Sequence, residues 1–417
     1  MRSSFQIGVA LFALFVMLGA VAPAQDQPTA PPSAAQPPPL DLKPEQYADD
    51  ESAERTAVEL ENAYPAETRP EAIKMLVAIL RGSQMGSREG WFGPARSRYG
   101  WQWLAIKQGW DPAVEMLKRD EFNGSDAQFR PLDRDRDGQI TPDDFDWSDN
   151  NPWVQQASQV TRFFRRLNAR GDGRLTQADL AAFFERAAGG KDHLTVGDMR
   201  DALLAGLGGG SAAGNEPSRE VLVRGLLAGE VGSRHEGPAL NDPAPDFTLA
   251  TAAGQTTYQL SKLVGDKPVV LVFGNFTCGP FRALYPEVDD LHERYKDQAV
   301  FLMVYVREAH PLDGWAMESN ATANVAVKQP TTLSERTTVC TEFCQRLKPT
   351  LPVVVDTLDD AAGHAYSGMP ARLYVIDRQG KVAYKSGRGP FGFKPSELEQ
   401  SLVMALLEAG GDPKKTP

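Results

Sequence analysis

The sequence predicts an α/β domain in residues 241–410 and an all-α region in residues 44–205. Short apolar runs alternate with helical patterns through the first of these segments, which is typical of a mixed sheet with flanking helices. Acidic twelve-residue loops occur between helical patterns in the second segment, and they are typical of calcium-binding modules. With 417 residues, 41% of them hydrophobic, the chain is long enough for each segment to bury a core.

The chain is acidic overall, with a net charge of -11 at pH 7 and a pI of about 5.1. Proteins that bind nucleic acid usually carry a basic face, so no nucleic-acid partner is expected. An acidic surface is consistent with cation binding and also with solubility alone.

The N-terminus has the pattern of a secretory signal. Arg2 supplies a positive charge, residues 7–21 are largely apolar, and Ala22-Pro23-Ala24 offers a cleavage site. We therefore expect residues 1–24 to be a signal peptide and the protein to be exported, although an uncleaved membrane anchor is the alternative. No second long apolar run follows, which predicts a soluble mature protein. Residues 25–43 are rich in Pro and Ala and are expected to be disordered.

The region at 44–205 begins with a helical pattern over residues 44–86. A dense group of aromatic residues follows, and such groups more often pack a core than bind a ligand. The group comprises Trp91, Phe92, Tyr99, Trp101, Trp103 and Trp110.

Residues 133–144 match an EF-hand calcium loop. Carboxylates occupy the first, third and fifth places, a glycine makes the turn at the sixth, and the seventh offers a backbone carbonyl. Asp at the twelfth place is one methylene shorter than the usual Glu, so a modest calcium affinity is expected. The predicted Ca²⁺ ligands are Asp133, Asp135, Asp137, Gln139 and Asp144.

A second loop, residues 168–179, begins thirty-five residues after the first, which is the spacing of paired EF-hands. Ile140 is expected to pair the two loops. Asn168, Asp172 and Asp179 match ligand places, but Arg170 puts a cation where a ligand belongs. The sequence leaves open whether this loop binds metal.

A Gly-rich linker with a short helix is predicted for residues 206–240, and a disordered tail for 411–417. The α/β domain between them follows from its periodicity. Its expected strands are 269–273, 300–306, 351–355, 372–376 and 382–385, and its expected helices include 281–296 and 333–347.

Cys278 lies where the first of these strands turns into a helix. Helix N–H groups and the helix dipole stabilise a thiolate at such a place, so an exposed thiol of low pKa is predicted. Cys278-Gly-Pro-Phe281 is half of a C-G-P-C redox motif, with Phe281 in place of the second cysteine. The alternative is an inert buried cysteine.

Cys340 and Cys344 are the other two cysteines, and an odd total leaves at least one thiol outside any intramolecular disulfide. Four residues apart on a predicted helix, they share one face. They are candidates for a resolving thiol, and the alternative is that both pack the helix.

Several motifs in one order resemble the iodothyronine deiodinases, a family with a thioredoxin-like fold. Met369-Pro370 lies where that fold places a cis-proline facing the active thiol. Residues 242–249 also resemble the entry to that fold. The motifs that resemble the deiodinases themselves lie at residues 274–278, 304–315, 352–357, 370–374, 383–385 and 389–390.

The resemblance implies roles for particular residues. Cys278 stands at the selenocysteine of the family and would be the nucleophile, with Thr277 beside it. Glu308 and His310 would relay or donate a proton. The residues implied in substrate binding are Trp315, Pro370 and Arg372. The family also has a cysteine where this chain has Phe276, and a second histidine that has no counterpart here in residues 327–330.

The resulting hypothesis is an exported thiol-dependent oxidoreductase with a calcium-binding module. It would act on a small molecule, and the sequence leaves the natural substrate open. An external thiol would return Cys278 to its reduced state. The family resemblance also allows a homodimer. One alternative is a thiol peroxidase, and another is a non-catalytic protein that interacts with partners in a calcium-dependent manner.

Overall fold

The computed structural model describes residues 41–86, 94–111, 113–204 and 217–410. The predictions for the signal peptide, the C-terminal tail, Trp91 and Phe92, most of the Pro/Ala-rich segment and the first part of the linker lie outside these residues. All described residues belong to one compact unit. Among them, no helix is both long and apolar enough to cross a lipid bilayer.

The predicted helical stretch at 44–86 is interrupted by prolines. Pro65 and Pro70 lie between its two main helices, and proline lacks the N–H that a continuing helix needs. The Asp49 side chain caps the first of these helices by accepting a hydrogen bond from Ser52 N at 2.7 Å. The elements are η1 (Pro44–Gln46), α1 (Asp50–Ala63) and α2 (Glu71–Leu80), which pack with α8 (Arg219–Leu227) in a small core.

We call the described residues between 94 and 204 the calcium-loop region. It contains short strands as well as helices, so the prediction of an all-α region is wrong. β2 pairs with β3 through Leu117 and Ile140, which means that residues 133–144 pair with an upstream segment and not with residues 168–179. The expected pairing of the two loops is therefore wrong. The elements are β1 (Arg96–Ser97), α3 (Trp101–Gln108), β2 (Leu117–Lys118), α4 (Asp126–Phe129), β3 (Gln139–Ile140), η2 (Pro142–Phe145), α5 (Pro152–Leu167), α6 (Gln177–Ala188) and α7 (Val196–Leu204).

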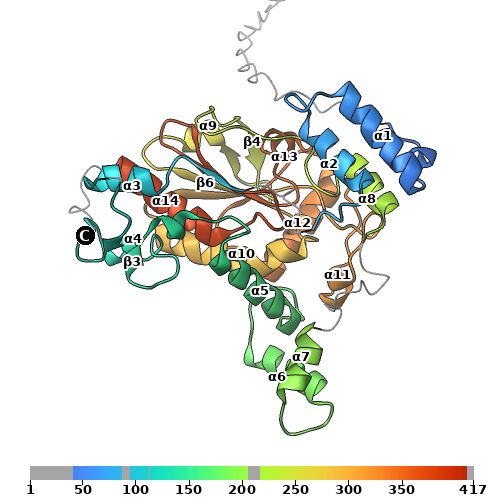
Figure 1. Cartoon of the computed structure of the whole chain (residues 1–417), viewed down its shortest axis with the longest axis horizontal. Coiled ribbons are helices and arrows are strands. Elements are labelled where there is room, and N and C mark those ends of the chain that lie inside the picture. The colour runs from blue at the N-terminus through green and yellow to red at the C-terminus, as the bar shows by residue number, and fades with distance from the viewer. Residues whose placement is uncertain (1–40, 87–93, 112, 205–216, 411–417) are drawn as a thin grey trace, which may run out of the picture. The chain divides into compact units, whose positions relative to one another are not determined.

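A mixed sheet forms the centre of the α/β domain, as predicted (Figure 1). The sequence predicts five of its six strands but not the sixth, β1 (Arg96–Ser97). β6, β7 and β8 are mutually parallel, β9 runs antiparallel to β6, and β10 runs antiparallel to β9. A central strand with a parallel crossover on one side and an antiparallel hairpin on the other is a thioredoxin-like arrangement. The strand order is β1, β10 (Val382–Lys385), β9 (Arg372–Ile376), β6 (Val269–Gly274), β7 (Val300–Tyr305) and β8 (Val353–Val355).

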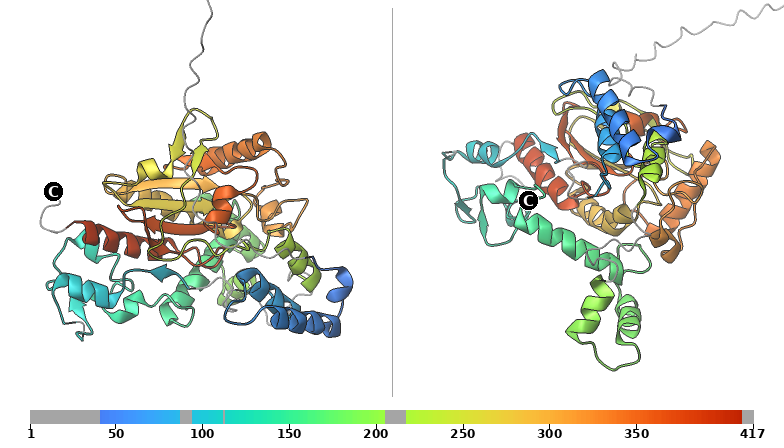
Figure 2. Two further views of the ribbon diagram at one scale, coloured as in Figure 1. Left: turned by 90° about the horizontal axis from the view of Figure 1, so that it is seen from above. Right: turned by 45° about the vertical axis from the view of Figure 1, so that its right-hand side comes forward.

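Helices cover both faces of this sheet, which explains why its central strands are apolar without alternation. α10, α12 and α14 pack on one face, and α9 and α13 on the other (Figure 1). Figure 2 (left) shows the strands side by side. The remaining elements are β4 (Thr248–Ala250), β5 (Thr257–Gln259), α9 (Leu260–Leu263), α10 (Gly279–Tyr295), α11 (Glu318–Thr322), α12 (Leu333–Leu347), α13 (Ala361–Ala365) and α14 (Pro395–Ala409).

The calcium-loop region and the α/β domain share a hydrophobic core. Tyr99 and Trp101 are buried in the same cluster as Phe276 and the apolar face of α10. β1 extends the sheet by pairing with β10, with Ser97 opposite Tyr384. The predicted packing role of the aromatic group is thus confirmed for its buried members, and Trp103 and Trp110 pack against the cluster.

Candidate active site

Cys278 is the N-cap residue of α10, at the strand-to-helix turn that the sequence predicts. Its side chain is only 1% exposed, so the prediction of an exposed thiol is wrong. Burial raises the pKa of the thiol, although the Phe281 N–H and the guanidinium groups of Arg282 and Arg165 act to lower it. Removal from water therefore outweighs the helix terminus that the sequence argument relied on.

Asn275 ties the cysteine to the proline segment. Its Oδ1 accepts a hydrogen bond from Cys278 N at 3.0 Å, and its Nδ2 donates one to Pro370 O at 2.9 Å. The Met369–Pro370 bond is cis, as the resemblance implies. Sequence reasoning missed Asn275, although an asparagine between a buried strand and a cysteine is a signal that could have been used.

Glu308 is fully buried beneath the residue that precedes the thiol. Its Oε2 accepts hydrogen bonds from Thr277 Oγ1 at 2.7 Å and from Thr277 N at 2.8 Å, and its Oε1 accepts one from the Tyr305 hydroxyl. Burial raises the pKa of this carboxyl, against the effect of those hydrogen bonds. Glu308 can therefore hold a proton under conditions where an exposed glutamate would not. Tyr305 was not among the predicted residues.

His310 is joined to the same network. Its backbone N–H donates to Thr277 Oγ1 at 3.0 Å, and its Nδ1 lies 3.0 Å from Trp315 O. Since a carbonyl only accepts, Nδ1 carries the proton and Nε2 is left as an acceptor. Burial lowers the pKa of His310 to about 4, so the ring is neutral at pH 7. The structure thus brings together Cys278 and the predicted Thr277, Glu308 and His310.

Trp315 packs beside this network, with its ring centroid 4.8 Å from that of His310 in an edge-to-face arrangement. Its backbone N–H donates to Glu230 Oε2 at 3.1 Å. Arg372, by contrast, is buried and its guanidinium donates to backbone carbonyls, which include Ser386 O at 3.2 Å and Glu236 O at 3.3 Å. In this structure Arg372 holds chain segments together, and its predicted substrate contact stays a prediction.

Cys340 and Cys344 lie on one face of α12, as predicted. Cys340 is fully buried in the core that also contains Cys278, and Cys344 packs against that core. A hydrogen bond between the two thiols raises the pKa of Cys340 and lowers that of Cys344. Their placement fits the packing alternative, and a resolving role stays a prediction.

Comparison with known proteins agrees with this geometry. A family model described as iodothyronine deiodinase matches residues 232–405. The C-terminal domain matches the iodothyronine deiodinases. We call residues 232–405 the deiodinase-like domain; they include the Cys278, Thr277, Glu308 and His310 network and the cis-proline.

Individual deiodinases show the same relation. The type I iodothyronine deiodinase of Xenopus laevis is 32% identical over 155 residues, which cover 37% of this chain and 59% of that protein. The thyroxine 5-deiodinase of Gallus gallus is 37% identical over 164 residues, 39% of this chain and 62% of that protein. The chain thus spans about 60% of the length of these relatives.

Among solved structures, a thiol:disulfide interchange protein of the thioredoxin family from Chlorobium tepidum aligns with a TM-score of 0.29 at 18% identity. The alignment covers 41% of this chain and 99% of that chain.

Outside the deiodinase-like domain, residues 133–144, called loop 1, bring carboxylates together. Ligand oxygens of Asp133, Asp135 and Asp137 lie within 4.8 Å of one another. Asp133 is buried, and its Oδ1 has no hydrogen-bond partner. A buried carboxylate oxygen without a donor is costly, and a hard divalent cation would satisfy it. Asp144 is turned inward, where it accepts from Thr141 N at 2.7 Å and Arg134 N at 2.8 Å.

Residues 168–179, called loop 2, differ from loop 1 at the third position, where Arg170 replaces a carboxylate. Arg170 Nε and Nη2 donate to the two carboxylate oxygens of Asp179 at 3.1 and 3.0 Å. Asn168 Nδ2 donates to Asp172 Oδ1 at 3.0 Å. An internal guanidinium therefore engages the ligands that a calcium ion would need.

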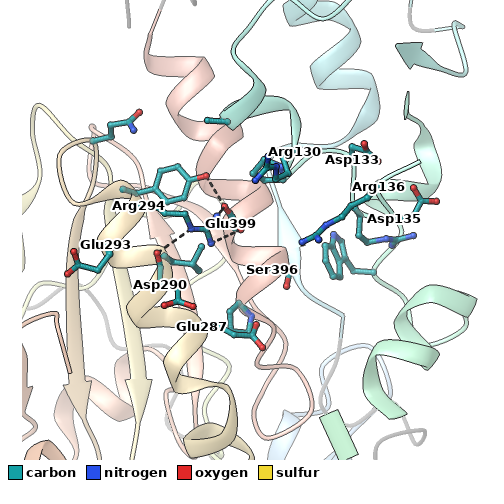
Figure 3. A pocket seen from close by; sticks show the side chains of 18 of the residues that line it. Arg130, Asp133, Asp135, Arg136, Glu287, Asp290, Glu293, Arg294, Ser396 and Glu399 are labelled. Carbon is teal, nitrogen blue, oxygen red and sulfur yellow. Dashed lines mark hydrogen bonds and ion pairs between the residues drawn. The ribbon is translucent and has the colours of Figure 1, made fainter. Parts of the chain in front are cut away.

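Two cavities border the contact between the calcium-loop region and the deiodinase-like domain. Loop 1 and the helices α10 and α14 line the first, of about 1010 Å³, and Figure 3 shows Asp133 and Asp135 across it from Asp290 and Glu293. The second, of about 570 Å³, lies between α5 and the start of α10. Cys278 lines neither of them, but Arg165 and Pro280 line the second.

Proposed function

We propose that this protein is an exported, thiol-dependent oxidoreductase of the deiodinase type, with Cys278 as its nucleophile. The supporting observation is the buried network of Thr277, Glu308 and His310 around the N-cap cysteine of α10, inside the segment that matches the family. A small organic halide and an external thiol would be its reactants. A homodimer stays a prediction.

The proposed reaction is the reductive removal of iodine from carbon. The Cys278 thiolate attacks iodine and forms an S–I bond, the C–I bond breaks, and its electron pair stays on carbon, which takes up a proton. An external thiol then attacks the sulfur, releases iodide and leaves a mixed disulfide. A second thiol breaks this disulfide and restores Cys278, so that two thiols are oxidised while C–I is reduced to C–H.

Glu308 is the better proton source of the two candidates. Its pKa is raised by burial, so it can carry a proton, whereas His310 is neutral with its proton engaged by Trp315 O. His310 Nε2 is then available to accept a hydrogen bond from the substrate. Trp315 supplies an aromatic surface next to that acceptor.

The test uses purified protein, dithiothreitol and an iodothyronine, with released iodide as the readout. Iodide release that is lost in Cys278→Ser would support the proposal. If Cys278 reacts with a thiol probe and yet no iodide forms from any aryl iodide offered, the reaction class is wrong.

A thiol peroxidase is the second candidate, favoured by the two guanidinium groups near Cys278. The thiolate would attack one peroxide oxygen, the O–O bond would break, and water and a sulfenic acid would form before two thiols reset the enzyme. Consumption of hydrogen peroxide without iodide release would select it. A protein with neither activity and an unreactive Cys278 would instead be a calcium-dependent interaction protein.

We further propose that loop 1 binds Ca²⁺ through Asp133, Asp135, Asp137, the Gln139 carbonyl and Asp144. The clustered carboxylates and the unsatisfied Asp133 oxygen support this proposal. Export would place the site in a calcium-rich medium, where a modest affinity suffices. Isothermal titration with calcium tests it, since no heat of binding at millimolar calcium would refute it.

A further inference from the structure

α5 carries Arg165 from the calcium-loop region to the head of α10 (Figure 1). A Cβ added to Gly279 would lie 3.3 Å from Arg165 Nη2 and 3.9 Å from Arg282 Nη2, so both guanidinium groups lie against the residue that follows Cys278. A glycine at this position makes room for two cations. A Cβ there would displace the Arg165 guanidinium by a few tenths of an ångström and would make an ordinary contact with Arg282.

Neither cation forms an ion pair with an acidic side chain in the part of the chain that the structure describes, although the Glu308 carboxyl acts on Arg282 from a distance. Arg282 donates only to uncharged groups: Gly171 O at 3.1 Å, Asn320 Oδ1 at 2.9 Å and Phe276 O. Burial lowers the pKa of the half-buried Arg165 guanidinium, and the acidic group that favours its charged form is the Cys278 thiol. A cation withdrawn from water is costly unless it faces an anion. This site can form two anions, the Glu308 carboxylate and the Cys278 thiolate, and of these the thiolate acts on both Arg282 and Arg165.

Loop 2 fixes the end of α5 that bears Arg165. Arg174, in this loop, donates to Leu347 O at 3.2 Å and lies 3.3 Å from Asp289, while Arg346 donates to Arg170 O at 3.0 Å. Gly171 O holds the Arg282 side chain. Because Arg170 already neutralises loop 2, this docking is independent of any ion in that loop.

We propose that Arg165 is a positioning residue of the thiol site, supplied from outside the deiodinase-like domain, whose guanidinium stabilises the Cys278 thiolate together with Arg282. This inference rests on the proposed function only in taking Cys278 as the reacting group. Other groups act on the same thiol from each element around it: Arg282 on α10 favours the thiolate, and Glu308 after β7 opposes it when ionised. His310 is neutral.

The experiment measures the rate at which iodoacetamide alkylates Cys278 in the full-length protein between pH 6 and 11.5, with the labelled peptide quantified by mass spectrometry. The midpoint of the pH profile gives the thiol pKa. For Arg165→Gln we expect a rise of about one unit and a roughly tenfold slower reaction below the midpoint. Arg165→Lys should recover part of the shift, and Arg166→Gln, the same charge change one residue away on α5, should show little.

Two outcomes would overturn the inference. The midpoint of Arg165→Gln could equal that of the wild type, or it could fall while the high-pH rate rises, which would mean that Arg165 only covers the thiol. Thermal melting of each variant shows whether it is folded, and Arg165→Lys keeps the test open if Arg165→Gln is not. A shifted midpoint in a protein that releases no iodide and consumes no peroxide would sink the proposed function and leave the role of Arg165 standing.

Discussion

Loop 1 and loop 2 share one twelve-residue pattern, but they differ in what neutralises their carboxylates. In loop 1 three aspartates converge and one buried oxygen has no partner. In loop 2 the third place holds Arg170, whose guanidinium pairs with Asp179. The residue at the third place thus separates a loop with an unpaired buried carboxylate oxygen from a loop whose Asp179 pairs with its own Arg170.

Their surroundings differ as well. Loop 1 reaches α5 at its N-terminal end, where Arg134 donates to Asp143 at 2.8 Å. The Arg134 guanidinium also lies 5.3 Å from the ring centroid of Trp147 and 5.1 Å from that of Trp153. Loop 2 packs on the deiodinase-like domain at the other end of the same helix. We infer that loop 1 serves cation binding, whereas loop 2 has become a docking surface.

The largest expected effect comes from the glycines at the sixth place of each loop. A Cβ on Gly173 would lie 2.6 Å from Pro286 Cδ and 2.7 Å from the carbonyl oxygens of Arg282 and Ala283, and its φ is +73°. Gly173→Ala should lower the free energy of unfolding by about 3 kcal/mol, because strain and overlap add. The matched control is Gly138→Ala, where φ is +88° with nothing within 4 Å, and it should cost about 1 kcal/mol. Equal costs in urea unfolding would contradict the docking of loop 2.

The second largest expected effect is the gain in stability on calcium binding, which should depend on loop 1 and not on loop 2. At a concentration one hundred times the Kd, bound calcium adds about 2.7 kcal/mol to the stability of the folded protein. Asp135→Asn should abolish most of this gain, which thermal melting with and without calcium measures. Asp172→Asn in loop 2 should leave the gain unchanged. A calcium response that disappears in the loop 2 variant instead would reverse the assignment.

Arg170→Asp should convert loop 2 into a second cation site. The change removes the internal cation and places an oxygen ligand at the third position. Isothermal titration should then report two calcium ions per chain in place of one. Arg186→Asp at the end of α6 makes the same charge change without entering the loop, and it should not raise the stoichiometry.

The smallest expected effect is the loss, at low pH, of the stability that Asp179 in loop 2 contributes. Burial by itself would raise the pKa of Asp179. Hydrogen bonds from Thr176 and Arg170 outweigh this effect and hold the pKa below its usual 3.8. A carboxyl with a lowered pKa in the folded state contributes stability above pH 3.8 and loses it as pH falls through the folded-state pKa. Asp179→Asn should therefore cost about 1 kcal/mol at pH 7 and less at pH 3, as judged by urea unfolding at both values. A cost that does not change with pH would argue against an ionised Asp179.

Much of the thiol site follows from local sequence. The alternation of apolar runs with helical patterns predicts the central sheet, and the turn before Cys278 predicts its place at the N-cap of α10. Thr277, Glu308 and His310 follow from motif order. The roles of Asn275 and Tyr305 were not predicted, because Asn275 Nδ2 donates to the distant Pro370 O and the Tyr305 hydroxyl accepts from the distant Phe276 N.

The sequence by itself predicted the central-sheet strands of the deiodinase-like domain, the calcium-type loops and the place of Cys278 at a strand-to-helix turn, because these depend on short-range periodicity and on residue types within a single turn. Only the tertiary structure decided that the thiol is buried, that Arg372 faces backbone carbonyls, and that Arg165 lies at the head of α10. The burial of the thiol and the placement of charged groups beside it depend on contacts between segments over one hundred residues apart. One example is the hydrogen bond that the Arg282 side chain donates to Gly171 O. No local pattern encodes such contacts, since packing of the whole chain selects them.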